Sequence, residues 1–155
     1  MERPYAINRL DPADFRRCGN IWNMEQRSDL AGRFYRELVR GDRITYVYQI
    51  GEEYIGEVSL VFDMEDPDYT IPGQRIYVSR LLVKHAYRRQ GVGKKLTAFA
   101  IEAAESMGFL EQSIGVDLDN YAAMMLYTGL GFRTIVFLGE DAGGKYVKLL
   151  RRSHE

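Results

Sequence analysis

Two glycines and several basic side chains in the middle of the chain are arranged to bind phosphate. The segment reads Arg88-Arg89-Gln90-Gly91-Val92-Gly93-Lys94, and it opens a predicted amphipathic helix. The first four amides of a helix have no partner within it, and with the helix dipole they attract anions. Because glycine has no β-carbon, a phosphate can approach the backbone at Gly91 and Gly93. The segment therefore predicts a turn that binds a diphosphate.

Other phosphate-binding motifs fit this segment less well. The Walker motif needs Gly, four residues and then Gly-Lys-Ser/Thr, and the sequence has no such run. The dinucleotide-binding fingerprint needs a third glycine where Leu96 stands. From the residues alone, a tight turn with solvated basic side chains remains an open alternative.

The turn and two other motifs resemble the GNAT superfamily of N-acetyltransferases. That family has the pyrophosphate motif Arg/Gln-x-x-Gly-x-Gly/Ala, preceded by a Leu-x-Val strand that Leu81-Leu82-Val83 matches. A further family motif is an asparagine at a strand end, then a short helix that bears a tyrosine and closes in Gly-Phe. Asn120, Tyr127 and Gly131-Phe132 reproduce it in order. The resemblance covers nearly the whole chain.

The resemblance implies acetyl-coenzyme A as co-substrate and assigns roles to these residues. Backbone amides of residues 90–94 would hold the pyrophosphate. Main-chain groups of Leu81 and Val83 would bind the acetyl carbonyl and the pantetheine arm, Asn120 would bond the pantetheine, and Tyr127 would face the sulfur. The predicted cofactor-binding residues are Leu81, Leu82, Val83, Arg88, Arg89, Gln90, Gly91, Val92, Gly93, Lys94, Asn120 and Tyr127. Two alternatives stay open: Asn120 as a helix cap, and Tyr127 as a ring packed against Phe132.

Acetyl transfer to an amine needs a general base and gains from a proton donor at the leaving thiolate. Tyr127 is the candidate donor, and Glu57, on a predicted strand near the expected acceptor cleft, is the first candidate base. Asp63, Glu65 and Tyr77 are further options. The alternative for Glu57 is an exposed carboxylate on the sheet. No metal is expected, because His85 and His154 are the only imidazoles.

We expect direct acetyl transfer from acetyl-coenzyme A to a primary amine of a small molecule. Ribosomal-protein N-terminal acetyltransferases usually have a Leu-Glu-Val-Arg-like strand, whereas this chain has Ile114-Gly115-Val116-Asp117. Two alternatives remain: a protein N-terminal or lysine acetyltransferase, and a non-catalytic module that binds coenzyme A or a partner. The acidic segment with Asp63, Glu65, Asp66 and Asp68 could attract a cationic amine or simply be a solvated loop.

Composition excludes several other classes. The chain has 155 residues, 46% hydrophobic and 28% charged, with a net charge of -1. This near-neutral charge argues against nucleic acid as a partner, and no apolar run is long enough for a membrane span. The single cysteine, Cys18, and the lack of a signal-like N-terminus favour a cytoplasmic protein. Dimers are common in the resembling family, so a homodimer is one option.

These residues must be positioned by alternating strands and helices. The pattern predicts one domain over residues 1–155 of the α/β (α+β) class, with a GNAT-like, mixed, mostly antiparallel sheet of about seven strands and about four helices. Its predicted strands are residues 5–10, 43–50, 54–62, 75–83, 113–116, 132–138 and 145–150. Its predicted helices are a first one capped by Asp11, then residues 28–40, 91–107 and 121–128.

Overall fold

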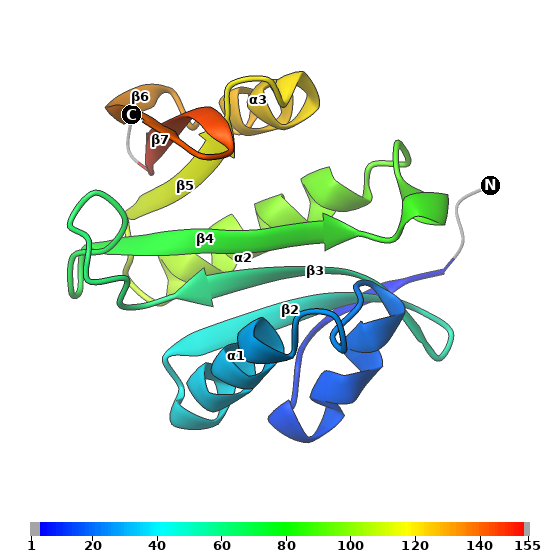
Figure 1. Ribbon diagram of the computed structural model, residues 1–155. Coiled ribbons are helices and arrows are strands. Elements are labelled where there is room, and N and C mark those ends of the chain that lie inside the picture. Colours follow the sequence, from blue (N-terminus) through cyan, green and yellow to red (C-terminus); the bar gives the residue numbers. More distant parts are fainter. Residues whose placement is uncertain (1–3, 154–155) are drawn as a thin grey trace. The chain divides into compact units, whose positions relative to one another are not determined.

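The computed structural model describes residues 4–153, so residues 1–3, His154 and Glu155 lie outside the described part. Seven strands form one sheet in the order β1-β2-β3-β4-β5-β7-β6 (Figure 1). Strands β4 and β5 pair in parallel, whereas the β1–β2, β5–β7 and β6–β7 pairs are antiparallel. The predicted fold class is therefore confirmed. In chain order the elements are β1 (Ala6–Arg9), η1 (Pro12–Asn20), α1 (Ser28–Arg40), β2 (Arg43–Ile50), β3 (Glu53–Val61), β4 (Arg75–Val83), η2 (His85–Tyr87), α2 (Val92–Ser106), β5 (Glu111–Asp117), α3 (Tyr121–Gly129), β6 (Thr134–Asp141) and β7 (Gly144–Arg152).

The chain forms two compact units, residues 1–60 with 80–100 and residues 61–79 with 101–155. The boundary between the units divides two elements. Residues 80–83 of β4 and 92–100 of α2 belong to the first unit, and the remaining residues of both elements belong to the second. The prediction of one domain stays a prediction. Among the described residues, no helix is long and apolar enough to cross a membrane.

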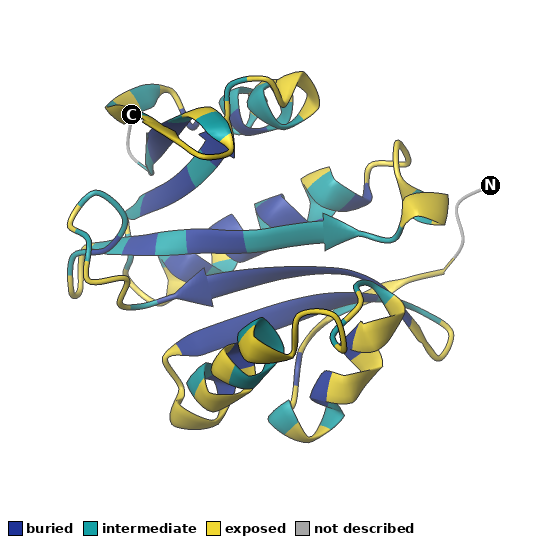
Figure 2. Cartoon of the chain, viewed as in Figure 1, coloured by how far each residue is buried: buried dark blue, intermediate teal, exposed yellow. Residues whose placement is uncertain are grey.

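The first unit is built on β2 and β3, which are buried along most of their length (Figure 2). Asp11 caps η1 by accepting a hydrogen bond from the amide of Ala13 (3.0 Å), as predicted, although η1 is a 3-10 helix. Helix α1 ends at Gly41, whose φ of 82° is the left-handed conformation that glycine adopts without strain. One core cluster joins η1, α1 and the neighbouring strands through Leu10, Phe15, Cys18, Phe34, Leu38, Val47 and Tyr54.

The second unit is built on the antiparallel strands β5, β7 and β6. Glu111, at the start of β5, binds Arg75 of β4 (3.1 Å) and Arg152 of β7 (3.4 Å). These ion pairs join three strands at one end. At the other end of the β5–β7 pair, Asp117 is the pairing partner of Tyr146, and Gly115 is the pairing partner of Lys148. This register gathers polar side chains at one place in the unit.

The buried faces of the later helices do not follow apolarity alone. In α2 the buried residues include Thr97, Ile101 and Ala104, whereas Met107, just past the end of the helix, is exposed. In α3, 76% of Met125 is exposed. Small and polar side chains such as Thr97 can therefore occupy a tight helix contact while methionines lie outside it.

Candidate functional site

The glycine turn in the first unit has the backbone that an anion site requires. Gly91 has a φ of 82° and Arg89 a φ of 63°, so the chain reverses sharply before α2 begins at Val92. The amide of Lys95 is bonded to the carbonyl of Gly91 (3.1 Å). The amides of Gly93 and Lys94 precede this bond and have no acceptor within the helix. The turn therefore offers backbone donors at the positive end of a helix.

The strand before the turn ends in a fixed position. The amide of Lys84 donates to the carbonyl of Ile55 on β3 (2.8 Å), and the Arg88 side chain donates to the carbonyl of Val83 (3.1 Å). Residues 81–83 are half-buried, whereas residues 88–90 are exposed. Just before them, Arg80 has a φ of 57°, a conformation that costs a non-glycine residue about 1–2 kcal/mol. Backbone strain thus lies next to the residues predicted to hold the acetyl group and the pantetheine arm.

Glu57 lies in the interior of the first unit and is only 3% exposed, so the alternative of an exposed sheet carboxylate is wrong. Its carboxylate accepts a hydrogen bond from the Trp22 indole (2.7 Å). The Arg80 guanidinium lies 4.7 Å from the centre of the Trp22 ring. Burial raises the pKa of Glu57 to about 7, against the opposing effects of the Arg80 charge, the Trp22 hydrogen bond and the Arg43 charge. A carboxyl that titrates near neutrality suits a general base, and the catalytic role of Glu57 stays a prediction.

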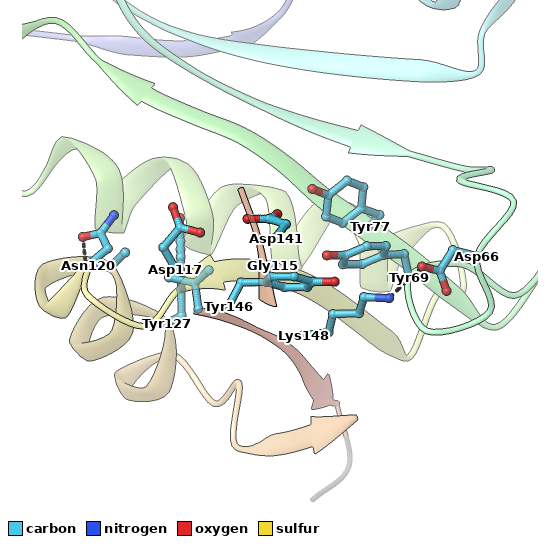
Figure 3. A pocket seen from close by; sticks show the side chains of 12 residues that line it. Asp66, Tyr69, Tyr77, Gly115, Asp117, Asn120, Tyr127, Asp141, Tyr146 and Lys148 are labelled. Carbon is cyan, nitrogen blue, oxygen red and sulfur yellow. Dashed lines mark hydrogen bonds and ion pairs between the residues drawn. The ribbon is translucent and has the colours of Figure 1, made fainter. Parts of the chain in front are cut away.

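A cavity of about 520 Å³ in the second unit contains both Asn120 and Tyr127. Figure 3 shows Asn120 at one end of this cavity, and Asp66 with Lys148 at the other. The side-chain oxygen of Asn120 accepts a hydrogen bond from the amide of Ala123 (3.1 Å), which confirms it as the cap of α3. The cavity is lined by Asp66, Tyr69, Tyr77, Gly115, Val116, Asp117, Asn120, Ala123, Tyr127, Asp141, Tyr146 and Lys148.

Tyr127 lines the cavity with a ring that is packed against the interior of the unit. Its ring lies 6.0 Å from that of Phe132 in an edge-on arrangement, so the predicted packing contact is confirmed. The residue is 8% exposed, and its hydroxyl has no hydrogen-bond partner within residues 4–153. Burial, with a smaller effect of Tyr77, raises the pKa of Tyr127 to about 12. The phenol is therefore protonated at neutral pH and has a proton that it could donate.

The acidic segment before β4 does not act as one cluster. Asp66 and Asp68 both bind the Lys148 ammonium, at 2.8 and 3.1 Å. Asp63 and Glu65 do not line the cavity but a second hollow with Phe62 and Phe109, and Asp66 lines both. Of the alternative bases, only Tyr77 lines the same cavity as Tyr127.

Sequence reasoning gave no site role to several residues of this cavity, among them Asp117, Asp141, Tyr146 and Lys148. Tyr146 and Lys148 lie two positions apart on β7, so both side chains point to the same face of the sheet. The spacing of these two side chains along the strand was the available signal. Asp141 lies at the end of β6, where the sequence reads as an ordinary turn.

Comparisons with known proteins agree with the architecture of both units. The model of the acetyltransferase (GNAT) family matches residues 5–132. N-alpha-acetyltransferase 30 of Xenopus laevis is 30% identical over 90 residues, which are 58% of this chain and 32% of that protein. This chain therefore spans about a third of the length of that relative.

Solved structures share the fold at low sequence identity. An aminoglycoside 6'-acetyltransferase type Ii has a TM-score of 0.77 at 18% identity, covering 97% of this chain and 98% of the other. The PaiA N-acetyltransferase of Thermoplasma acidophilum, solved in complex with coenzyme A, has a TM-score of 0.68 at 18% identity, covering 96% and 99%. With the family match over most of its length, this chain belongs to the acetyltransferase (GNAT) family.

Proposed function

We propose that the protein is an N-acetyltransferase that transfers the acetyl group of acetyl-coenzyme A directly to a primary amine of a small molecule. The observation that carries this proposal is the turn at Gly91, where a left-handed glycine precedes helix amides that have no acceptor within α2. Such a turn fits a pyrophosphate, and exposed Arg89 and Lys94 supply positive charge beside it. Family membership makes acetyl-coenzyme A the expected source of that pyrophosphate.

The proposed reaction needs an amine that has lost its proton. An amine with a pKa near 10.4 is neutral in only about one molecule in 2,500 at pH 7. Glu57, whose pKa is raised to about 7, is the candidate for taking up that proton. The protonated phenol of Tyr127 is the candidate for supplying a proton to the leaving thiolate.

A small-molecule acceptor is supported by the cavity of the second unit. Its volume of about 520 Å³ lies within the range of small-molecule sites. The fold neighbour named for aminoglycoside acetylation is also consistent with this acceptor class, while the relative named for N-alpha-acetylation represents the protein alternative.

The test combines binding and turnover. We expect acetyl-coenzyme A to bind in calorimetry, and free thiol to be released when amines from a panel of diamines, aminoglycosides, amino acids and short peptides are added. Binding without thiol release for any amine would favour the non-catalytic module. Release with peptides alone would favour a protein acetyltransferase.

The turn itself can be tested with a matched pair of variants. Gly91→Glu places bulk and negative charge in the turn, and we expect it to abolish acetyl-coenzyme A binding. Gly41→Glu is the control, because Gly41 has the same φ of 82° and also has nothing within 4 Å of an added β-carbon. Both variants carry similar backbone strain, so unchanged affinity in Gly91→Glu, or equal loss in both, would contradict the pyrophosphate assignment.

A further inference from the structure

We infer that the acceptor carries at least two amino groups: one stays protonated beside Asp117 and Asp141, and another receives the acetyl group. This inference rests on the proposed function and names the acceptor class of the cavity in the second unit. The substrates that fit are aliphatic polyamines and ring-borne polyamines such as aminoglycosides, which share this chemistry.

The charges of the cavity support a cationic occupant. Three carboxylates line it, and one of them, Asp66, is already bound to Lys148. Asp117 has no hydrogen-bond or ion-pair partner for its carboxylate within residues 4–153. Asp141 accepts only the amide of Gly143 (2.9 Å) among these residues. Two carboxylates therefore face the cavity without a cation.

Aromatic rings provide a second attraction for an organic cation. Tyr69 and Tyr77 lie with their ring centres 4.5 Å apart, and Tyr146 lines the same cavity. Gly115 makes this arrangement possible, because a β-carbon at that position would lie 2.5 Å from the Tyr69 hydroxyl. Ammonium groups are attracted to the faces of such rings and to carboxylates together.

The protein already holds one ammonium group with this combination. The Lys148 ammonium lies 2.8 Å from Asp66 and 3.1 Å from Asp68. The same atom lies 4.9 Å from the centre of the Tyr69 ring and 4.5 Å from that of Phe137. The walls of this cavity thus stabilise a protonated primary amine in the folded protein itself.

The cavity also has a distinct end for the chemistry. Tyr127 lines the cavity and is 8% exposed, and its hydroxyl has no hydrogen-bond partner among the described residues. Figure 3 shows Asp141 between the Asn120 end and the Lys148 end. A molecule with two amino groups can therefore place one near Tyr127 and the other beside the free carboxylates.

The reaction leaves the second amino group unchanged. The deprotonated nitrogen forms the new C–N bond to the acetyl carbon, and the thioester C–S bond breaks. The sulfur leaves with the bonding electron pair and gains one proton, which balances the further proton that the nitrogen loses as it becomes an amide. The proton removed earlier from the ammonium group is released to solvent. The other ammonium keeps its proton and serves only in binding.

Thiol release provides the test when matched amines are compared. We expect the kcat/KM for 1,5-diaminopentane to be about tenfold or more above that for n-pentylamine. Comparing kcat/KM for spermidine and for kanamycin then distinguishes linear from ring-borne acceptors. In Asp117→Asn and Asp141→Asn this preference should fall about fivefold each, as for partly exposed ion pairs. Asp119→Asn is the control, because Asp119 is exposed like Asp117 and Asp141 but does not line the cavity. A preference that is absent in the wild type, or equal in all variants, overturns the inference.

A titration with spermidine, without the acetyl donor, separates the two proposals. We expect it to bind, with an affinity that falls in Asp117→Asn but not in Asp119→Asn. If no amine releases thiol, the proposed function fails and takes the acetylated amino group of the inference with it, and this titration then decides only whether the cavity binds a polyamine. Absence of spermidine binding in folded protein, or thiol release with monoamines and neutral peptides equal to that with diamines, overturns it.

Discussion

Replacing Glu57 by glutamine should remove a pH dependence of stability that this one buried carboxyl creates. The introduced glutamine is nearly isosteric with the natural side chain, and its amide oxygen can still accept the bond from the Trp22 indole (2.7 Å in the wild type). The substitution removes only the ability to ionise. Glu53→Gln is the matched control, because Glu53 lies on the same strand but is exposed.

The magnitude follows from the raised pKa. Below pH 4.5 the folded and unfolded chains both carry the proton; between 4.5 and about 7 only the folded chain keeps it. Over that interval the free energy of unfolding falls by about 1.4 kcal/mol per pH unit as pH rises, and the contribution is lost above it. Between pH 5 and pH 8 the wild type should therefore lose about 2–3 kcal/mol more than the Glu57→Gln variant.

Denaturant unfolding at pH 5, 6, 7 and 8 measures this difference for wild type, Glu57→Gln and Glu53→Gln. We expect Glu57→Gln alone to flatten the curve. If it keeps the wild-type slope, Glu57 does not titrate near neutrality and loses its main support as a general base. If the slope flattens and turnover also falls about 100-fold at pH 7, the loss is chemical, because the fold is then known to be intact.

Three further outcomes are expected. Tyr127→Phe should lower kcat about 100-fold with little change in the calorimetric Kd for acetyl-coenzyme A, and equal losses would instead indicate a packing role. Gly115→Ala should lower the free energy of unfolding by about 1–3 kcal/mol because its β-carbon meets the Tyr69 hydroxyl at 2.5 Å; a gain in stability by denaturant unfolding would show that the ring moves freely. Burial raises the pKa of Glu111, but hydrogen bonds, that of Arg75 among them, outweigh this and lower it. Glu111→Gln should therefore cost about 2 kcal/mol at pH 7, and this loss should shrink at pH 3, which the same unfolding assay checks.

Local signals in the sequence determine most element boundaries. Helix α1 runs over the predicted residues 28–40 because Gly41 supplies the left-handed residue that ends it. The cap at Asp11 is likewise a local interaction, with an amide two residues away. The glycine turn could be predicted from the sequence for the same reason, because the glycines that its backbone conformation requires and its basic side chains lie within one short segment.

Long-range contacts explain what the sequence could not reveal. Strand β5 begins at Glu111, earlier than predicted, because Glu111 and Gln112 look like loop residues in isolation. Gln112 is fully buried, and its side chain bonds the carbonyl of Phe109 (2.7 Å). The cavity depends on register: Gly115 meets Lys148, and Asp117 meets Tyr146, only once β5 and β7 have paired. No local pattern links those pairs.

The bond network around Lys148 also bears on how acceptor preference can change in evolution. Lys148 holds Asp66 and Asp68, while Arg75 donates to the carbonyls of Pro67 and Asp68, so the segment of residues 62–74 is fastened at several points. Loss of the lysine would free two carboxylates and loosen that segment in a single mutation. A new ligand preference and greater susceptibility to proteolysis would then be inherited together. Selection for a different amine would act on both traits at once.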